Sequence, residues 1–295
     1  MKNISILGLG NISFELCSAL IKQGFNVFGS TDNYDRQVIL KKMGVRVFSR
    51  SNIGQCILKA DKLIITIPPD NFGCKILQTY SQEIIDSKVR WIGYLSSTSV
   101  YGNYNGEEVN ENSKLRPKES LEKNRVKAEQ DLLGFGTKYS IIVEIFRLSG
   151  IYGNNKNVIN QIITKKVKPI YKEGHYFNRI HEKDIARVLC LACANQMNSG
   201  IINLSDNLPA SQLDVLIYAY TIMNKSMPEY INYSDISNEM SNNLRRFWEN
   251  NRRVNNSLLK TKYGNLLFPT YKEALKSIYH NYEMQSRYKD CIIIK

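Results

Sequence analysis

The sequence predicts an α/β protein built on a doubly wound parallel sheet of the Rossmann type. Three observations support this prediction: a strand that runs into a glycine turn near residue 1, short apolar runs that alternate with amphipathic patterns, and an acidic residue about twenty positions after the turn. Strands that alternate with helices form βαβ units, so we expect parallel strands with helices on both faces of the sheet.

Each element of the first half follows from its own pattern. Short apolar runs predict strands at 3–8, 25–29, 45–48, 62–67, 90–96 and 140–146. Amphipathic stretches between these runs predict helices at 12–23, 34–43, 52–58, 71–86 and 118–134.

The rhythm changes near residue 150, where strand patterns become rare. One strand-like piece remains at 200–204, and helical patterns fall at 155–165, 181–195, 209–224, 236–248 and 270–280. No repeat or low-complexity linker separates the two halves. We therefore expect a dinucleotide-binding Rossmann domain at residues 1–150. A mixed C-terminal region at 151–295 should hold a smaller substrate lobe and elements that complete the sheet domain.

The composition narrows the class of protein. The chain has 295 residues, of which 43% are hydrophobic and 23% charged, as in globular proteins. No apolar run is long enough to span a membrane and no cleavage site stands out, so we expect a cytoplasmic protein without a membrane partner. The net charge of +13 is spread along the chain, and we expect no nucleic-acid partner. The six cysteines lack metal-ligand company, and no metal site is predicted.

The glycine turn predicts a nucleotide site. The first strand ends at Gly8, where the backbone turns, and Gly10 leaves bare backbone for a pyrophosphate. The next helix directs its N-terminal amides at the same place. We expect Gly8, Gly10, Asn11 and Ile12 to contact a nicotinamide dinucleotide.

Two charged residues after the second strand bear on the choice of cofactor. Asp32 could accept both hydroxyls of the adenosine ribose and repel a 2′-phosphate, which favours NAD. Like charges 4 Å apart at an effective dielectric of 20 repel by roughly 4 kcal/mol, enough to decide selectivity. Arg36 lies one helical turn later and could instead accept a 2′-phosphate. NAD is the favoured cofactor here, with NADP as the alternative.

Further cofactor contacts are expected where later strands end. In an open α/β sheet the ligand lies over the carboxyl ends of the strands. The fourth strand ends at Ile67, Pro68 and Pro69, and the fifth ends near Ser96. We expect these four residues to border the cofactor, with the two prolines also acting as a rigid strand exit.

Several motifs together resemble a known family. The fifth strand leads into a Ser-Ser-x-x-Val-Tyr-Gly run at 96–102, after a GxGxxS turn at 8–13 and a D-x-x-x-x-x-x-P-P pattern that starts at Asp61. With the runs 146–153 and 179–186, these motifs resemble the short-chain dehydrogenase/reductase superfamily in its extended, NAD-dependent epimerase/dehydratase branch. The late segments at 251–256 and 268–273 resemble an atypical subgroup, the YeeZ-like proteins.

The resemblance implies roles at the active site and exposes a gap. Ser97 takes the place of the family's catalytic Ser/Thr, which hydrogen-bonds the substrate oxygen. The family's acid/base Tyr falls on Leu121, which cannot transfer a proton, and its Lys falls on Arg125, which can hold a ribose or phosphate but cannot act as a base. Tyr101 is one residue that could take over, although a packing role is the alternative for it.

Four further residues are expected at the substrate. Arg147 and Arg179 flank the expected cleft, and a guanidinium fits phosphate or carboxylate bidentately. Tyr152 and His181 complete the predicted substrate set. The structural alternatives are a surface ion pair for the arginines and a capping role for His181.

The sequence thus indicates an atypical NAD(P)-dependent oxidoreductase, epimerase or dehydratase. Its expected substrate is a small polar molecule, of which a nucleotide sugar is one example. A homodimer is the habit of the family. The alternative function is a non-catalytic dinucleotide-binding regulator or scaffold, because the usual Tyr-x-x-x-Lys pair is missing, and both hypotheses stay open at this point.

Overall fold

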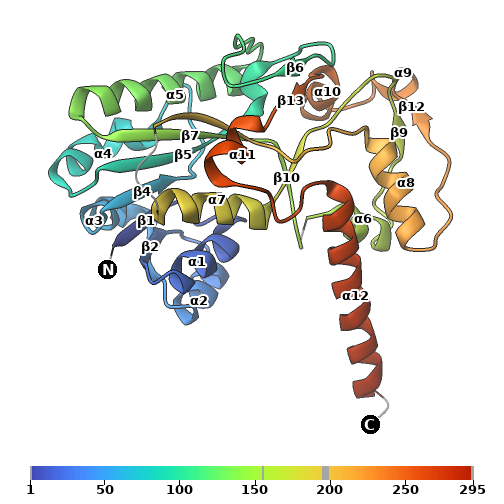
Figure 1. The fold of residues 1–295 in the computed structure, drawn as a ribbon, viewed down its shortest axis with the longest axis horizontal. Coiled ribbons are helices and arrows are strands. Elements are labelled where there is room, and N and C mark those ends of the chain that lie inside the picture. Colours follow the sequence, from blue (N-terminus) through green and yellow to red (C-terminus); the bar gives the residue numbers. More distant parts are fainter. Residues whose placement is uncertain (1, 155, 195–198, 294–295) are drawn as a thin grey trace.

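The computed structural model describes residues 2–154, 156–194 and 199–293, and it is built on one seven-stranded parallel sheet (Figure 1). The strands are short and mostly buried, as expected for a parallel sheet covered on both faces. In sheet order they are β11 (Gly200–Leu204), β7 (Ile142–Leu148), β5 (Trp91–Ser97), β4 (Lys62–Ile65), β1 (Asn3–Leu7), β2 (Asn26–Ser30) and β3 (Arg46–Phe48).

The strand order reverses between β1 and β4. From β1 the chain builds outward through β2 and β3, and then returns to add β4, β5, β7 and β11 on the other side. All the ladders are parallel, so the carboxyl ends of the strands meet at one edge of the sheet. This arrangement confirms the predicted Rossmann-type fold and places a ligand crevice at the reversal.

Helices cover both faces of the sheet and bury two apolar layers. One layer includes Leu16, Leu40 and Leu189, and the other includes Ile57, Ile84 and Leu132. The helices of the first face are α1 (Ser13–Lys22), α2 (Tyr34–Lys42) and α7 (Glu182–Ala194), and those of the second are α3 (Ile53–Leu58), α4 (Lys75–Asp86) and α5 (Ser120–Tyr139).

A smaller lobe packs against the end of the sheet. Its core holds Ile159, Leu216 and Leu275, which come from three helices: α6 (Val158–Ile163), α8 (Gln212–Ile222) and α12 (Tyr271–Ile293). Figure 1 shows α12 running away from the body of the molecule to the C-terminus. The lobe also contains α9 (Tyr233–Ile236), α10 (Asn242–Glu249) and the two-residue strands β9 (Ile170–Tyr171) and β12 (Ile231–Asn232).

Segments far apart in the sequence connect the lobe to the sheet domain. Two short ladders pair β8 (Gly150–Tyr152) with β10 (Arg179–His181), and β6 (Glu108–Val109) with β13 (Arg253–Val254). Although they follow residue 150, α7, β11 and α11 (Ser257–Tyr263) pack within the sheet domain.

The predicted elements of the first half are confirmed, and the main differences lie after residue 150. The helix predicted at 236–248 begins only at Asn242, because the Ser241 hydroxyl caps it by accepting from the amide of Leu244, and Ile236 ends a separate short helix. The helix predicted at 270–280 continues to Ile293. The two-residue strands were not predicted, because so short a run shows no periodicity.

Candidate functional site

The glycine turn lies at the carboxyl end of β1, beside the crevice where the strand order reverses. Gly8 has a φ of +100°, and a Cβ added there would lie 2.7 Å from Oγ1 of Thr66, so no larger residue fits. Around Gly10 there is more room, because the nearest atom to an added Cβ is the Gly8 carbonyl oxygen at 4.0 Å. Protein atoms therefore close the turn at Gly8 and leave it open at Gly10.

Helix α1 begins directly after the turn, and no side chain caps its first amides. Its N-cap, Ile12, is apolar and buried, while Asn11 is exposed on the turn. Uncapped amides at the start of a helix attract an anion. The open backbone at Gly10 and the free helix N-terminus together fit the pyrophosphate of a dinucleotide.

Asp32 and Arg36 both lie beyond the end of β2, in different surroundings. Oδ1 of Asp32 accepts a hydrogen bond from the backbone amide of Arg50 at 2.8 Å, and the Arg50 Nε lies 3.8 Å from Oδ2. Arg36 reaches back to the glycine turn, where Nη2 donates to Oδ1 of Asn11 at 2.6 Å and Nη1 to the carbonyl of Leu9 at 3.3 Å. Arg36 thus contacts the turn, whereas Asp32 is held by Arg50.

The strand ends provide some of the expected contacts and not others. Pro68 and Pro69 line the cleft, and Ile67 packs its Cγ1 2.8 Å from the position of a Gly8 Cβ. Ser96 points away from the cleft, because it is buried and its hydroxyl donates to Oε1 of Glu129 at 2.5 Å. The expectation that the Ser96 side chain contacts the cofactor is therefore corrected: it braces the interior.

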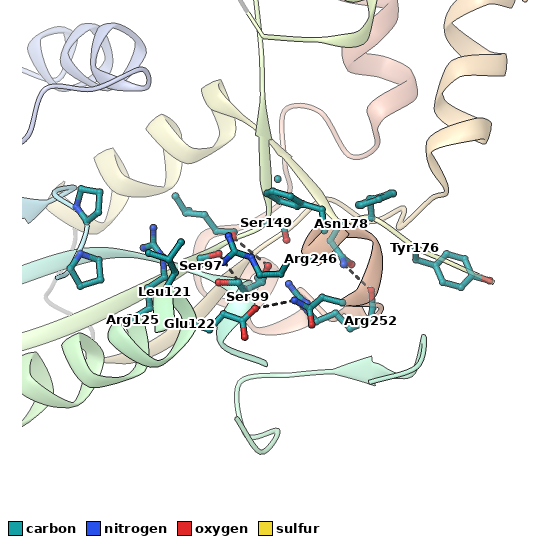
Figure 2. Close-up of a pocket in the computed structure, with 18 residues that line it drawn as sticks. Ser97, Ser99, Leu121, Glu122, Arg125, Ser149, Tyr176, Asn178, Arg246 and Arg252 are labelled. Atoms are coloured by element: carbon teal, nitrogen blue, oxygen red, sulfur yellow. Dashed lines mark hydrogen bonds between the residues drawn. The ribbon is translucent and has the colours of Figure 1, made fainter. Parts of the chain in front are cut away.

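A cleft of about 330 Å³ opens between the sheet domain and the smaller lobe (Figure 2). Residues after β4 and β5 and the first turn of α5 form one wall. The other wall comes from the lobe and consists of Tyr176, Phe177, Asn178, Arg246, Phe247, Asn250 and Arg252.

Ser97 lies in this cleft at the end of β5, where its extended backbone caps the 3₁₀ turn at Thr98–Tyr101. Its hydroxyl oxygen accepts a hydrogen bond from the amide of Ser99 at 3.1 Å. The hydroxyl proton stays available to a ligand, because the oxygen is the acceptor in that contact. Ser97 can therefore donate to an oxygen in the cleft.

Leu121 and Arg125 line the same cleft from the first two turns of α5. A capping box fixes the start of the helix. The side chain of Glu119 accepts a hydrogen bond from the backbone amide of Glu122, and the side chain of Glu122 accepts one from the backbone amide of Glu119. Leu121 is 55% exposed and carries no titratable group. The structure thus brings Ser97, Leu121 and Arg125 together around one cavity.

Arg147 and Tyr101 lie beneath the cleft in a buried polar network. Both side chains of the Arg147–Glu129 ion pair are almost fully buried, with Nη2 2.7 Å from Oε2. Tyr101 is fully buried; its hydroxyl donates to Oδ1 of Asn203 at 2.7 Å and accepts from Nη1 of Arg147 at 3.0 Å. Burial raises the pKa of Tyr101. The expected catalytic role of Tyr101 and substrate role of Arg147 are corrected, because neither side chain lines the cleft.

Arg179, Tyr152 and His181 also lie away from the cleft, at the β8–β10 ladder. Nη1 of Arg179 donates to the carbonyls of Phe177 and Ala210, at 2.9 and 3.1 Å. Tyr152 and His181 stack edge to face with ring centroids 5.2 Å apart. Burial lowers the pKa of His181 to about 4, so the ring is neutral at pH 7. These positions correct their predicted roles as substrate contacts.

A buried carboxyl next to this ladder makes stability depend on pH. Asp206 is 1% exposed, and burial raises its pKa from 3.8 to about 7, while Asp184 and Glu273 add repulsion that Arg179 partly offsets. Because the folded state binds this proton more tightly, stability falls as pH rises from about 4 to about 7, by up to about 1.4 kcal/mol per pH unit.

We therefore expect Asp206→Asn to flatten this decline and to stabilise the protein most above pH 7. Urea unfolding of both proteins at pH 5 and pH 7.5 measures the effect. Equal changes with pH in the two proteins would contradict this assignment.

The lobe's cleft residues were missed as site residues. Arg246 and Arg252 belong to the two Arg-Arg pairs of the sequence, Arg245-Arg246 and Arg252-Arg253, and that pairing was the available signal. Tyr176, Asn178 and Asn250 gave none, because they reach the cleft only through the packing of the lobe.

Among the side chains that the structure describes, no three of His, Cys, Asp or Glu gather to hold a metal ion. No helix in the described part of the chain is long and apolar enough to cross a membrane.

No family model matches the chain. Over 220 residues it is 25% identical to Protein YeeZ of Escherichia coli K12, covering 69% of this chain and 77% of YeeZ. The resemblance to the YeeZ-like proteins is confirmed. A conserved protein of unknown function from Silicibacter pomeroyi is 27% identical, with a TM-score of 0.88 over 95% of this chain and 99% of that chain.

A more distant neighbour carries a cofactor. The UDP-glucuronic acid 4-epimerase of Bacillus cereus, solved with UDP-glucuronic acid and NAD, has a TM-score of 0.74. It is 18% identical and covers 96% of this chain and 99% of its own, which shows a shared fold. This chain thus has a Rossmann-type α/β fold like that of this epimerase.

Proposed function

We propose that the chain is an NAD(P)-dependent enzyme that transfers a hydride to or from a small polar substrate, as an oxidoreductase, epimerase or dehydratase. One observation supports this most: the open turn at Gly10 and the cleft that holds Ser97 both lie where strands of the parallel sheet end. The strand ends between them bring both places to one edge of the sheet.

The residues at that edge fit the cofactor. Gly10 and the amides of α1 would hold the pyrophosphate, and Asp32 or Arg36 would contact the adenosine ribose. Pro68 would border the nicotinamide end of the site. When bound, the nicotinamide supplies the hydride chemistry, and the protein supplies binding and orientation.

The chain's own residues polarise the substrate without a protein base at the usual Tyr place. Ser97 donates a hydrogen bond to the substrate oxygen, and Arg125 stabilises negative charge that develops there. Leu121 moves no proton, so protons exchange with the substrate's own groups or with water in the cleft. The absence of a proton donor at Leu121 favours a substrate that carries its own acidic group, or one whose alkoxide the Arg125 guanidinium stabilises.

Leu121 also favours a second candidate, a protein that binds the dinucleotide without turnover. The two candidates differ in one readout. The enzyme transfers deuterium from labelled NADH or NADPH to a substrate, whereas the regulator binds the same cofactor and transfers none.

Ser97→Ala tests the mechanism. We expect turnover to fall by about 100-fold or more, because a donor aimed at the developing charge is lost, while cofactor affinity stays nearly the same. Ser51→Ala, an exposed serine beyond β3, is the control and should change neither quantity. Unchanged turnover in Ser97→Ala would remove this residue from the mechanism.

A further inference from the structure

The residues that line the cleft carry more positive than negative charge. Three arginines from three places in the chain line it: Arg125 on α5, Arg246 on α10, and Arg252 between α10 and β13. Glu122 is the single carboxylate in the same lining. Among the described residues, none of these three arginines forms an ion pair.

Glu122 is already occupied by protein donors. Its Oε1 accepts from Nδ2 of Asn250 at 2.9 Å, and its Oε2 accepts from the amides of Lys118 and Glu119 at 2.9 and 3.3 Å. Three guanidinium groups therefore share the cleft with one carboxylate whose oxygens are both used. A ligand that enters meets an excess of positive charge.

Arg252 is buried with part of its guanidinium unsatisfied. The residue is only 9% exposed; Nη1 donates to the carbonyl of Gly102 at 2.9 Å, and Nε has no protein partner. Burial lowers its pKa to about 10, against the attraction of Glu122. A buried guanidinium N–H without an acceptor is unfavourable, and an oxyanion in the cleft would relieve it.

Two serine hydroxyls of the cleft can also donate a hydrogen bond to a ligand. Oγ of Ser149 is buried without a partner, and Ser97 keeps its proton free. Asn178, by contrast, uses both ends of its amide on the backbone, donating to Arg252 and accepting from Val254. Figure 2 shows Arg246 and Arg252 on the lobe's side of the same space as Ser97 and Ser149. The site therefore matches a ligand rich in acceptors.

We propose that the substrate is a compact molecule with an oxyanion group, a carboxylate or a phosphate, which binds Arg246 and Arg252 while its reacting carbon faces Ser97. This rests on the proposed function for the reaction, but the anion site stands on the arginines alone. The cavity of about 330 Å³ lies at the small end for ligand sites, and it must also admit the nicotinamide end of the cofactor. A compact anion fits this space better than a nucleotide sugar.

The test measures binding by calorimetry with three probes: inorganic phosphate, malonate and UDP-glucose. We expect phosphate or malonate to bind, and the tighter of the two to identify the anion. Arg246→Gln and Arg252→Gln should each weaken that probe by about tenfold or more. Arg46→Gln is the matched control, because Arg46 is exposed at the start of β3 and lies outside the cleft lining, and the substitution removes the same charge. The affinity of this variant should stay as in the wild type.

Arg246→Gln keeps the proposal testable should Arg252→Gln fail to fold, because no hydrogen bond within the protein depends on the half-buried Arg246 side chain in the described structure. Equal binding by Arg246→Gln and the wild type, no binding of either small anion, or much tighter binding of UDP-glucose would overturn the proposal.

Repeating the titrations with saturating NADH or NADPH separates the two claims. Anion binding that survives the cofactor supports the substrate site, and competition between them would assign the arginines to the cofactor and overturn it. Anion binding in a protein that binds neither cofactor would refute the proposed function and leave the anion site standing.

Discussion

Replacing Gly10 with Val is expected to weaken binding of NADH and NADPH about 100-fold while the protein stays folded. The added Cβ meets no protein atom closer than 4.0 Å, so the isolated protein tolerates it. The side chain instead fills the space where a pyrophosphate would approach the bare backbone. A clash of about 3 kcal/mol weakens affinity roughly 100-fold. Nicotinamide fluorescence and thermal unfolding, measured on the same preparation, check both parts.

The control is Gly134→Ala, in the middle of α5. A Cβ there also meets nothing within 4 Å, and alanine should stabilise the helix by about 1 kcal/mol without touching the cofactor. Normal cofactor affinity in a folded Gly10→Val protein would refute the nucleotide site at the turn.

The second large effect is expected from Glu129→Gln. Glu129 is 2% exposed and receives Nε and Nη2 of Arg147 and the hydroxyl of Ser96. The substitution leaves the buried Arg147 guanidinium without its counter-charge, and removing one partner of a buried pair destabilises by about 3–5 kcal/mol. Urea unfolding at pH 7 measures this loss.

The comparison variant removes an exposed pair on the same helix. Lys127 lies 3.3 Å from Asp131 with half of its side chain exposed, so Lys127→Ala should change stability by about 0.5 kcal/mol or less. A loss below about 1 kcal/mol for Glu129→Gln would show that the network beneath the cleft does not stabilise the fold as its geometry implies.

The sheet domain could be predicted from the sequence because its information is local. Each strand is a short apolar run, and each helix between strands shows its own amphipathic period. The turn at Gly8 could likewise be predicted from adjacent residues. The structure explains why glycine is needed there, since φ is +100° and Thr66 leaves no room for a side chain.

The lobe's side of the cleft could not be predicted in the same way. Arg125 and Arg252 are separated by more than a hundred residues and share a cleft only after the β6–β13 ladder brings the chain back to the sheet domain. Neither the period nor the propensity of a segment encodes such long-range pairing. The sequence shows Arg252-Arg253 as a basic pair, but it does not show which of the two side chains faces the cleft.

Arg147 and Tyr101 show the opposite difficulty. Both lie in motifs that the family places at its active site, and both are polar groups near the end of a strand. Sequence does not distinguish a polar side chain in a cleft from one satisfied inside the protein. Here Glu129 and Asn203 supply the buried partners, and they come from α5 and β11.

A titration of the purified protein with NADH and with NADPH, followed by nicotinamide fluorescence, tests the nucleotide site most directly. We predict saturable binding with a micromolar dissociation constant and one cofactor per chain for at least one of the two. The ratio of the two affinities would also show whether Asp32 or Arg36 governs the choice. Binding of neither cofactor would contradict the central claim, because the turn at Gly8 and Gly10 would then hold no dinucleotide.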